Sequence, residues 1–189
     1  MNSKDKQRFS KFLSLILRHK PEEVGLTLMD NGWVNIDKLI DAVNSSAKSD
    51  YRINRQLVEE IVAEDIKQRY SISEDGELIR ANQGHSIKNL KIEFKEVTDT
   101  PLQLYHGTSV DNFEKIKDSG CIKAMSRQMV HLSGDIETAT KVGKRHGKLC
   151  ILYIDTCKLT SSGHKIFISE NGVYLVDEVQ LDCVIKIEK

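Results

Sequence analysis

The sequence predicts an α+β fold in two lobes, and three observations support this. Residues 5–64 contain three segments with helical spacing of apolar residues, and residues 69–81 have the pattern of a β-hairpin. The remainder holds many short strand-like runs with two brief helices. Separated helical and strand-rich regions are typical of α+β chains. We expect the lobes to cover residues 1–90 and 91–189, joined around residues 89–100.

The first predicted helix covers residues 5–20. Its apolar residues from Phe9 to Ile16 recur at i, i+3, i+4 and i+7, which is the spacing of one buried helix face. Pro21 disfavours helical backbone at Lys20, so the helix should end there. The helix therefore ends on Arg18-His19-Lys20, a cationic group at the end of an apolar face.

Two further helices and a hairpin complete the first lobe. Asn35 and Asn54 each precede an apolar helical face and are expected N-caps. In RYSISEDGELIRA, apolar and polar residues alternate on either side of an Asp-Gly turn. Three helices followed by a hairpin are the pattern of a winged-helix unit, which we predict for residues 1–90.

The second lobe is predicted to have a β core. A strand at LQLY should run into a loop at His106-Gly107-Thr108, and the next helix should end at Gly120. A second helix is expected in DIETATKVGKRHG. The other strand-like segments are MVHLS, KLCILYID, HKIFIS, GVYLVDEV and LDCVIKIE.

Composition limits the function classes. The 28 Lys and Arg residues balance 28 Asp and Glu residues, so no overall field attracts nucleic acid, although local patches remain open. One such patch lies in residues 1–20, and the basic run KVGKRHGK (141–148) has the composition of a solvated face. No targeting leader or long apolar span is present, so we expect a cytoplasmic protein with no membrane partner.

The cysteines indicate packing. Cys121, Cys150 and Cys183 lie in apolar strand-like segments, and the four cysteines form no CxxC pair and no Cys/His metal spacing. We therefore expect reduced core thiols and no metal site.

The arginines and histidines that could take part in chemistry indicate a function only when they are considered together. Arg18-His19 alone is compatible with the cations that favour a helix C-terminus, and a lone His131 in a strand is compatible with a core histidine. Arg69 and Arg127 alone are ordinary surface residues. Several arginines and histidines beside small residues, with no acidic pair, instead suggest an anionic substrate. Phosphoryl transfer is the reaction class that needs such groups.

At this point the sequence resembles a known family. The stretches LSLILRHKPE, KQRYSIS, IRANQGHS, LYHGT, SRQMVHLS and NGVYLVDEV occur in order between about residues 9 and 180. Together they are similar to the NAD-dependent tRNA/RNA 2′-phosphotransferases, for which a spliced tRNA junction is the best-known substrate class. The resemblance implies a winged-helix lobe that binds RNA and a second lobe like ADP-ribosyltransferases that binds NAD.

The resemblance also implies a two-step reaction. An internal RNA 2′-phosphate attacks NAD, which is consumed as a co-substrate, and nicotinamide leaves. ADP-ribosylated RNA then yields RNA with a free 2′-hydroxyl and ADP-ribose 1″,2″-cyclic phosphate. The family's catalytic Arg-His-Arg-Arg set falls on Arg18, His19, Arg69 and Arg127.

The implied NAD-binding residues lie in the second lobe. His106, Gly107 and Thr108 match one motif of the family, and His131 and Ser133 match a second. The implied substrate-binding residues also include Gln83 and His85. The resemblance implies no metal and no obligate protein partner.

Two other functions remain open at this stage. An ADP-ribosyltransferase that caps terminal phosphates of RNA or DNA would use the same residues and stop after the first step. A non-catalytic winged-helix protein that binds nucleic acid is the second alternative. The net charge of 0 and the presence of the whole Arg-His-Arg-Arg set argue against it.

Overall fold

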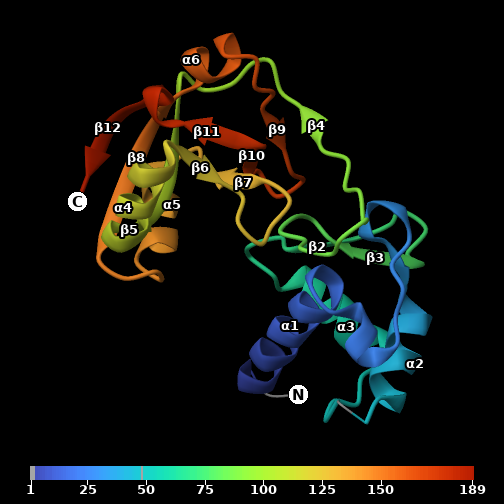
Figure 1. The fold of residues 1–189 in the computed structure, drawn as a ribbon. Helices are drawn as coiled ribbons and strands as arrows, with labels where there is room; N and C mark the ends of the chain where they lie inside the picture. Colours follow the sequence, from blue (N-terminus) through green and yellow to red (C-terminus); the bar gives the residue numbers. More distant parts are fainter. Residues whose placement is uncertain (1–2, 48) are drawn as a thin grey trace. The chain divides into compact units, whose positions relative to one another are not determined.

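The computed structural model describes residues 3–47 and 49–189 and confirms an α+β fold (Figure 1). The chain forms two compact units, Met1–Glu93 and Phe94–Lys189, which we call unit 1 and unit 2. The elements of unit 1 are α1 (Ser3–Arg18), η1 (Pro21–Val24), η2 (Asp30–Gly32), β1 (Val34–Asn35), α2 (Ile36–Ser45), α3 (Arg55–Ala63), β2 (Tyr70–Ile72) and β3 (Leu78–Ala81).

Unit 1 is built on the apolar face of α1. Phe9, Leu13, Ile16 and Leu17 are at most 1% exposed and pack in one core with α2, α3 and the small sheet. The helix ends at Arg18, earlier than predicted, because the N–H groups of His19 and Lys20 both donate to the Leu15 carbonyl. Because this face is buried, the position at which Arg18 and His19 leave the end of the helix is fixed.

The caps and the hairpin follow the sequence-based expectation. The side chain of Asn35 accepts from Lys38 N at 3.1 Å, and that of Asn54 accepts from Leu57 N at 2.9 Å. The sheet has the order β1-β3-β2, and its hairpin pairs Tyr70 with Ala81. Helices α1 to α3 lie on one side of this sheet (Figure 1).

Unit 2 consists of small antiparallel sheets with short helices. Its sheets have the strand orders β12-β8-β5, β4-β9-β10-β7 and β11-β6. Its elements are β4 (Lys95–Glu96), β5 (Gln103–Ser109), α4 (Val110–Ser119), β6 (Cys121–Lys123), β7 (Val130–Leu132), α5 (Ile136–Gly143), β8 (Leu149–Asp155), α6 (Thr156–Ser161), β9 (Phe167–Ile168), β10 (Tyr174–Val176), β11 (Glu178–Gln180), η3 (Leu181–Cys183) and β12 (Val184–Glu188).

The structure corrects two boundaries in unit 2 and adds a helix that the sequence did not predict. The predicted loop at His106-Gly107-Thr108 belongs to β5, because every residue from Gln103 to Ser109 pairs with β8. Helix α5 ends at Gly143, so the basic residues that follow lie in the connection to β8. The sequence interpretation missed α6, which Asp155 caps by accepting from Lys158 N.

Gly107 allows helix α5 to lie directly against β5. A β-carbon at Gly107 would lie 1.8 Å from the Ala139 carbonyl oxygen. No side chain fits such a distance without displacement of the helix. The glycine therefore has a packing role in unit 2, in addition to the ligand approach that the sequence suggested.

Unit 1 contains a buried histidine, His85. His85 is 2% exposed, and neither ring nitrogen has a hydrogen-bond partner among the described residues. Its Nε2 packs against Gly32, where an added β-carbon would lie only 3.0 Å away. Burial first, then the charges of Arg18, His19 and Arg80, lower the pKa of His85 from 6.5 to about 4. The imidazole is therefore neutral at physiological pH.

Three thiols belong to the core, as predicted. Cys121, Cys150 and Cys183 are buried, whereas Cys157 is exposed. Burial raises the pKa of the Cys150 and Cys183 thiols, which makes them poor nucleophiles. Within the described part of the chain, no helix has the length and apolar character needed to span a bilayer.

Replacement of Gly107 by alanine should destabilise unit 2. The new methyl group must displace α5, and overpacking of this kind costs about 1–3 kcal/mol. Chemical denaturation followed by circular dichroism measures the change. Gly120→Asn is the control, because Gly120 has φ +75° with open space around it and asparagine tolerates that backbone. Equal stability of Gly107→Ala and wild type would contradict the packing role.

The buried His85 should make the protein less stable in acid. Between pH 6.5 and about 4 only the unfolded chain protonates this residue, so stability falls as pH falls through that window. The loss amounts to about 3 kcal/mol at most, and no more is lost below it. Urea unfolding at several pH values should show a flatter profile for His85→Gln. The exposed His146→Gln is the control, and an unchanged profile for His85→Gln would refute the assignment.

Candidate active site

The end of α1 carries the first two predicted catalytic residues. Arg18 is the last residue of the helix, and His19 follows it on the surface. The helix C-terminus favours cations there through its dipole. The side chain of Arg18 lies along Gly84, since a β-carbon on that glycine would be 3.6 Å from Arg18 Nη1.

The segment after β3 holds these two residues in place. Ser86 N donates to the Arg18 carbonyl at 2.9 Å, and the Ser86 hydroxyl lies 2.8 Å from His19 Nδ1. Gly84, with φ +88°, permits the turn that brings Ser86 back to the helix. The predicted substrate-binding residues Gln83 and His85 flank that glycine, so the same segment carries them to the end of α1.

Arg69 joins the group from the loop between α3 and β2. Its carbonyl accepts from Arg18 Nη2 at 3.4 Å and from Asn82 N at 2.8 Å. Its side chain forms an ion pair with Asp65, whose own side chain is 5% exposed. Three predicted residues of unit 1, namely Arg18, His19 and Arg69, therefore lie at one place.

Arg127, the fourth predicted catalytic residue, belongs to unit 2. It lies in the turn between β6 and β7, where its N–H donates to the Ala124 carbonyl at 3.0 Å. Met125 in the same turn has φ +55°. Arg127 is exposed, and no ion pair of its side chain is found within residues 3–47 and 49–189. It is thus available to an anion.

The two predicted NAD motifs meet in unit 2. Tyr105 and Ser133 exchange both backbone hydrogen bonds, at 2.9 and 2.8 Å, which joins β5 to the end of β7. The Nδ1 atom of His106 lies 3.1 Å from the carbonyl oxygen of His131. Burial lowers the pKa of His106, and the nearby His146 adds to the effect, so its ring is neutral at physiological pH.

The other motif residues are buried to different degrees. Thr108 is 5% exposed and pairs with Cys150, while Gly107 faces α5. His131 Nδ1 lies 3.0 Å from the Met129 carbonyl, which orients that ring. A β-carbon on Gly134, next to Ser133, would lie 3.2 Å from the Tyr174 ring. Imidazole, hydroxyl and aromatic groups therefore gather around the junction of β5, β7 and β10.

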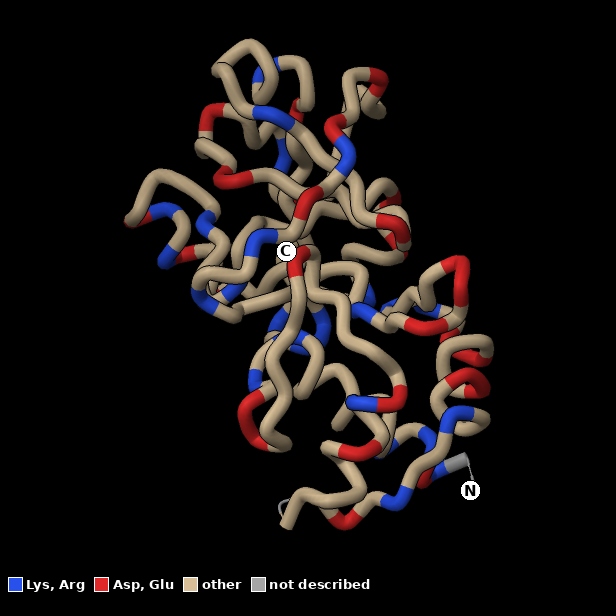
Figure 2. The backbone as a smooth tube through the Cα atoms, turned by 90° about the vertical axis from the view of Figure 1, so that its right-hand side faces the viewer, with Lys and Arg blue, Asp and Glu red and all other residues tan. Residues whose placement is uncertain are grey.

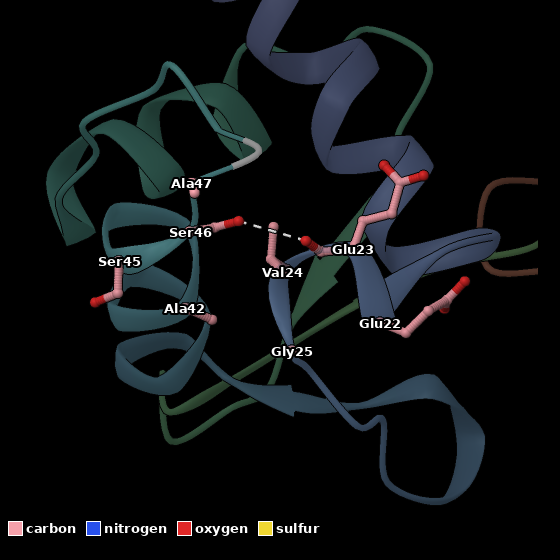
Figure 3. Close-up of a pocket in the computed structure, with 8 residues that line it drawn as sticks. All are labelled: Glu22, Glu23, Val24, Gly25, Ala42, Ser45, Ser46 and Ala47. Atoms are coloured by element: carbon pink, nitrogen blue, oxygen red, sulfur yellow. Dashed lines mark hydrogen bonds between the residues drawn. The ribbon is translucent and has the colours of Figure 1, made fainter.

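A shallow pocket in unit 1 lies apart from these residues (Figure 3). It is lined by Glu22, Glu23, Val24, Gly25, Ala42, Ser45, Ser46 and Ala47, none of which the sequence singled out. Two carboxylates at its rim disfavour a ligand rich in phosphate.

Charge and donor chemistry limit what the site can do. Lys and Arg are interspersed with Asp and Glu along the chain (Figure 2), so the positive charge of Arg18 and Arg69 is a local feature. Among the residues that the structure describes, no three His, Cys, Asp or Glu side chains are grouped to hold a metal ion. The arrangement suits recognition of an anion by guanidinium groups.

Sequence reasoning missed three residues at this site. Asp65 precedes Arg69 by four residues, but both lie in the loop after α3, where this spacing predicts no contact. Ser86 lies inside a quoted motif, yet its contact with His19 joins residues 67 positions apart. Arg80 stacks on Trp33, with its guanidinium carbon 4.5 Å from the ring centroid, and no sequence signal pointed to this contact.

Comparison with known proteins identifies the family. Residues 4–178 match the family described as RNA 2′-phosphotransferase, Tpt1 / KptA family. A probable RNA 2′-phosphotransferase of Fusobacterium nucleatum subsp. nucleatum is 49% identical over 91% of this chain and 93% of its own length. The probable RNA 2′-phosphotransferase of Pseudomonas syringae pv. tomato is 41% identical over 99% of this chain and 97% of its own.

A third relative agrees with these two. The probable RNA 2′-phosphotransferase of Escherichia coli strain K12 is 44% identical, with 96% of each chain covered. The family match extends through both units. The chain belongs to the RNA 2′-phosphotransferase family.

Proposed function

We propose that this protein removes an internal 2′-phosphate from RNA and uses NAD as a co-substrate. Nicotinamide and ADP-ribose 1″,2″-cyclic phosphate leave, and ADP-ribosylated RNA is the intermediate. The observation that carries the proposal is the convergence of Arg18, His19 and Arg69 at the end of α1 in a chain of this family. The relatives named above are described as acting on an RNA 2′-phosphate, which is the same chemistry.

Arg18, Arg69 and Arg127 are the proposed ligands of the RNA phosphates. A guanidinium presents several N–H donors in one plane and binds phosphate through two parallel hydrogen bonds. The second step places the most negative charge on the reacting phosphate, so preorganised donors contribute most there. Gln83 and His85 are proposed substrate contacts, because their segment bonds to Arg18 and His19.

His19 is the proposed group for proton transfer. The Ser86 hydroxyl engages Nδ1 at 2.8 Å, which supports Nε2 as the atom that exchanges a proton with the substrate. The ring is exposed, and Ser86 is itself held by the Arg18 carbonyl. Orientation of a general acid–base by a second group is a common feature of such sites.

Residues His106, Gly107, Thr108, His131 and Ser133 are proposed to bind NAD. The fit rests on imidazole, hydroxyl and backbone donors that meet where Tyr105 bonds to Ser133. These groups suit the pyrophosphate and ribose hydroxyls of a dinucleotide. When bound, NAD supplies the electrophilic ribose carbon, and the role of the protein is to orient it and exclude water.

We propose that one lobe binds RNA and the other binds NAD. Three helices followed by a hairpin support a winged-helix lobe for RNA in residues 1–90. Antiparallel sheets with short helices support an ADP-ribosyltransferase-like lobe for NAD in residues 91–189. The two compact units meet between Glu93 and Phe94, which is compatible with these bounds.

Removal of the 2′-phosphate should depend strictly on NAD and not on added metal. The described residues hold no grouped metal ligands, whereas the NAD motifs meet in unit 2. Incubation of a 2′-phosphorylated oligoribonucleotide with and without NAD, after treatment with chelator, should give dephosphorylated RNA only with NAD. Mass analysis of the products provides the measurement. A need for Mg²⁺ or Zn²⁺, or a product that keeps ADP-ribose on an RNA end, would overturn the proposal.

Arg69→Ala should slow the second step more than the first. One preorganised donor in such a site contributes about 3 kcal/mol, or roughly a hundredfold in rate. A single-turnover time course with labelled RNA should therefore show accumulation of ADP-ribosylated RNA. Arg69→Lys should restore little activity, because an ammonium group cannot donate two parallel hydrogen bonds. Product formation by Arg69→Ala at the wild-type rate would remove this residue from the site.

A further inference from the structure

The loop between α3 and β2 is organised by one carboxylate. Asp65 accepts from Lys67 N at 3.2 Å, from Arg69 N at 2.6 Å and from Arg69 Nη1 at 2.5 Å. Gln68 in this loop has φ +44°, an uncommon value for a residue with a side chain. The three bonds to Asp65 hold the loop in that conformation.

The same carboxylate fixes a guanidinium. The Asp65 side chain is 5% exposed and that of Arg69 is 32% exposed, so their charge-assisted bond is largely shielded from water. A guanidinium has five N–H donors, and this bond uses a donor on Nη1. The remaining donors include those on Nη2 and Nε, so Arg69 is oriented and still able to bind an anion.

The main-chain carbonyl of Arg69 also contacts a second arginine, Arg18. Arg18 Nη2 donates to the Arg69 carbonyl at 3.4 Å, and Asn82 N donates to the same oxygen at 2.8 Å. That carbonyl belongs to the residue whose N–H and side chain Asp65 holds. A shift of the Asp65 loop would therefore move the contact of Arg18 together with the side chain of Arg69.

Electrostatics gives Asp65 a second effect. The guanidinium groups of Arg18 and Arg80 both act on His85, so positive groups share this side of unit 1. Like charges at close range repel and favour displacement of the side chains. A buried carboxylate beside Arg69 offsets part of that repulsion before any anion binds.

We propose that Asp65 is a positioning residue for phosphate recognition, which holds Arg69 directly and Arg18 through the Arg69 carbonyl. This inference rests on the proposed function of the two arginines. It assigns to Asp65 a role in selecting the 2′-phosphate, beyond that of capping a turn.

Asp65→Asn removes the negative charge that pairs with the Arg69 guanidinium. The asparagine carbonyl still accepts the Lys67 N–H, because Asn forms the same turn as Asp. That same carbonyl stands in the place of Oδ1, so it offers Arg69 Nη1 only a neutral acceptor, and the amide nitrogen in the place of Oδ2 loses the bond from Arg69 N. The bond from Arg69 N is lost whether or not residue 69 carries a guanidinium, so the double-mutant cycle separates turn capping from the positioning role. Asp75→Asn is the matched control, since Asp75 accepts from Glu77 N at 3.0 Å in the hairpin turn and pairs with no arginine in the described structure.

The experiment compares RNA binding and turnover across a double-mutant cycle. Wild type, Asp65→Asn, Arg69→Ala and the double variant are titrated by fluorescence anisotropy with an oligoribonucleotide that carries or lacks a 2′-phosphate. Turnover with NAD is measured on the same samples. Circular dichroism selects a temperature at which all variants are folded. If Asp65→Asn is unfolded throughout, Asp65→Ser replaces it, because the serine hydroxyl also accepts at such turns.

The positioning role predicts a specific loss. Asp65→Asn should reduce the preference for 2′-phosphorylated over unphosphorylated RNA about tenfold, as expected for a lost charge-assisted contact. It should lower kcat by up to about a hundredfold, as misplaced groups do, and leave KM for NAD unchanged. In the Arg69→Ala background the same substitution should have a smaller effect, because only the contact of Arg18 with the main chain of residue 69 is left to disturb.

Three outcomes would overturn the inference. One is that Asp65→Asn behaves like Asp75→Asn. Another is equally tighter binding of both RNAs, because that would mean Asp65 contributes only its charge. The third is an equal loss in both backgrounds, which would indicate a structural role in the turn. Failure of wild type to turn over RNA with NAD would instead refute the proposed function, while the affinity cycle would still decide the role of Asp65.

Discussion

The burial of one helix face is the constraint on which unit 1 depends. Phe9, Leu13, Ile16 and Leu17 leave α1 a single rotational setting against the sheet and the other helices. That setting determines where the helix ends and in which direction Arg18 and His19 leave it. Arg18 and His19 are therefore placed by apolar packing, and the hydrogen bond from Ser86 and the close packing of Arg18 on Gly84 only complete their positions.

Polar contacts in unit 1 connect segments that are distant in the chain. Ser86 reaches His19, and Arg18 reaches the carbonyl of Arg69. Each contact closes a loop whose ordering costs conformational entropy, and the shared hydrophobic core supplies the free energy for it. The neutral His85 beside Arg18 is tolerated for the same reason, because protonation in that surrounding is more costly than an unpaired imidazole.

Local patterns predicted the elements of the fold better than their tertiary contacts. Helical spacing, the caps at Asn35 and Asn54 and the Asp-Gly turn were readable because they depend on neighbours in the chain. The extension of β5 through Gly107 was not readable, since pairing with β8 decided it. Resemblance supplied Arg18, His19 and Arg69 as candidates. Their partners Asp65 and Ser86 depended on geometry that a single sequence does not display.

The close approach of α5 to β5 changes how Gly107 is interpreted across relatives. A helix carbonyl occupies the space of its missing side chain, so packing alone favours glycine at this position, whatever reaction the protein performs. A glycine here is therefore evidence of the close contact between α5 and β5, and not by itself evidence of a binding site. Arg69 makes no comparable demand on the core, because its side chain is 32% exposed and pairs with Asp65, so packing alone does not require an arginine there.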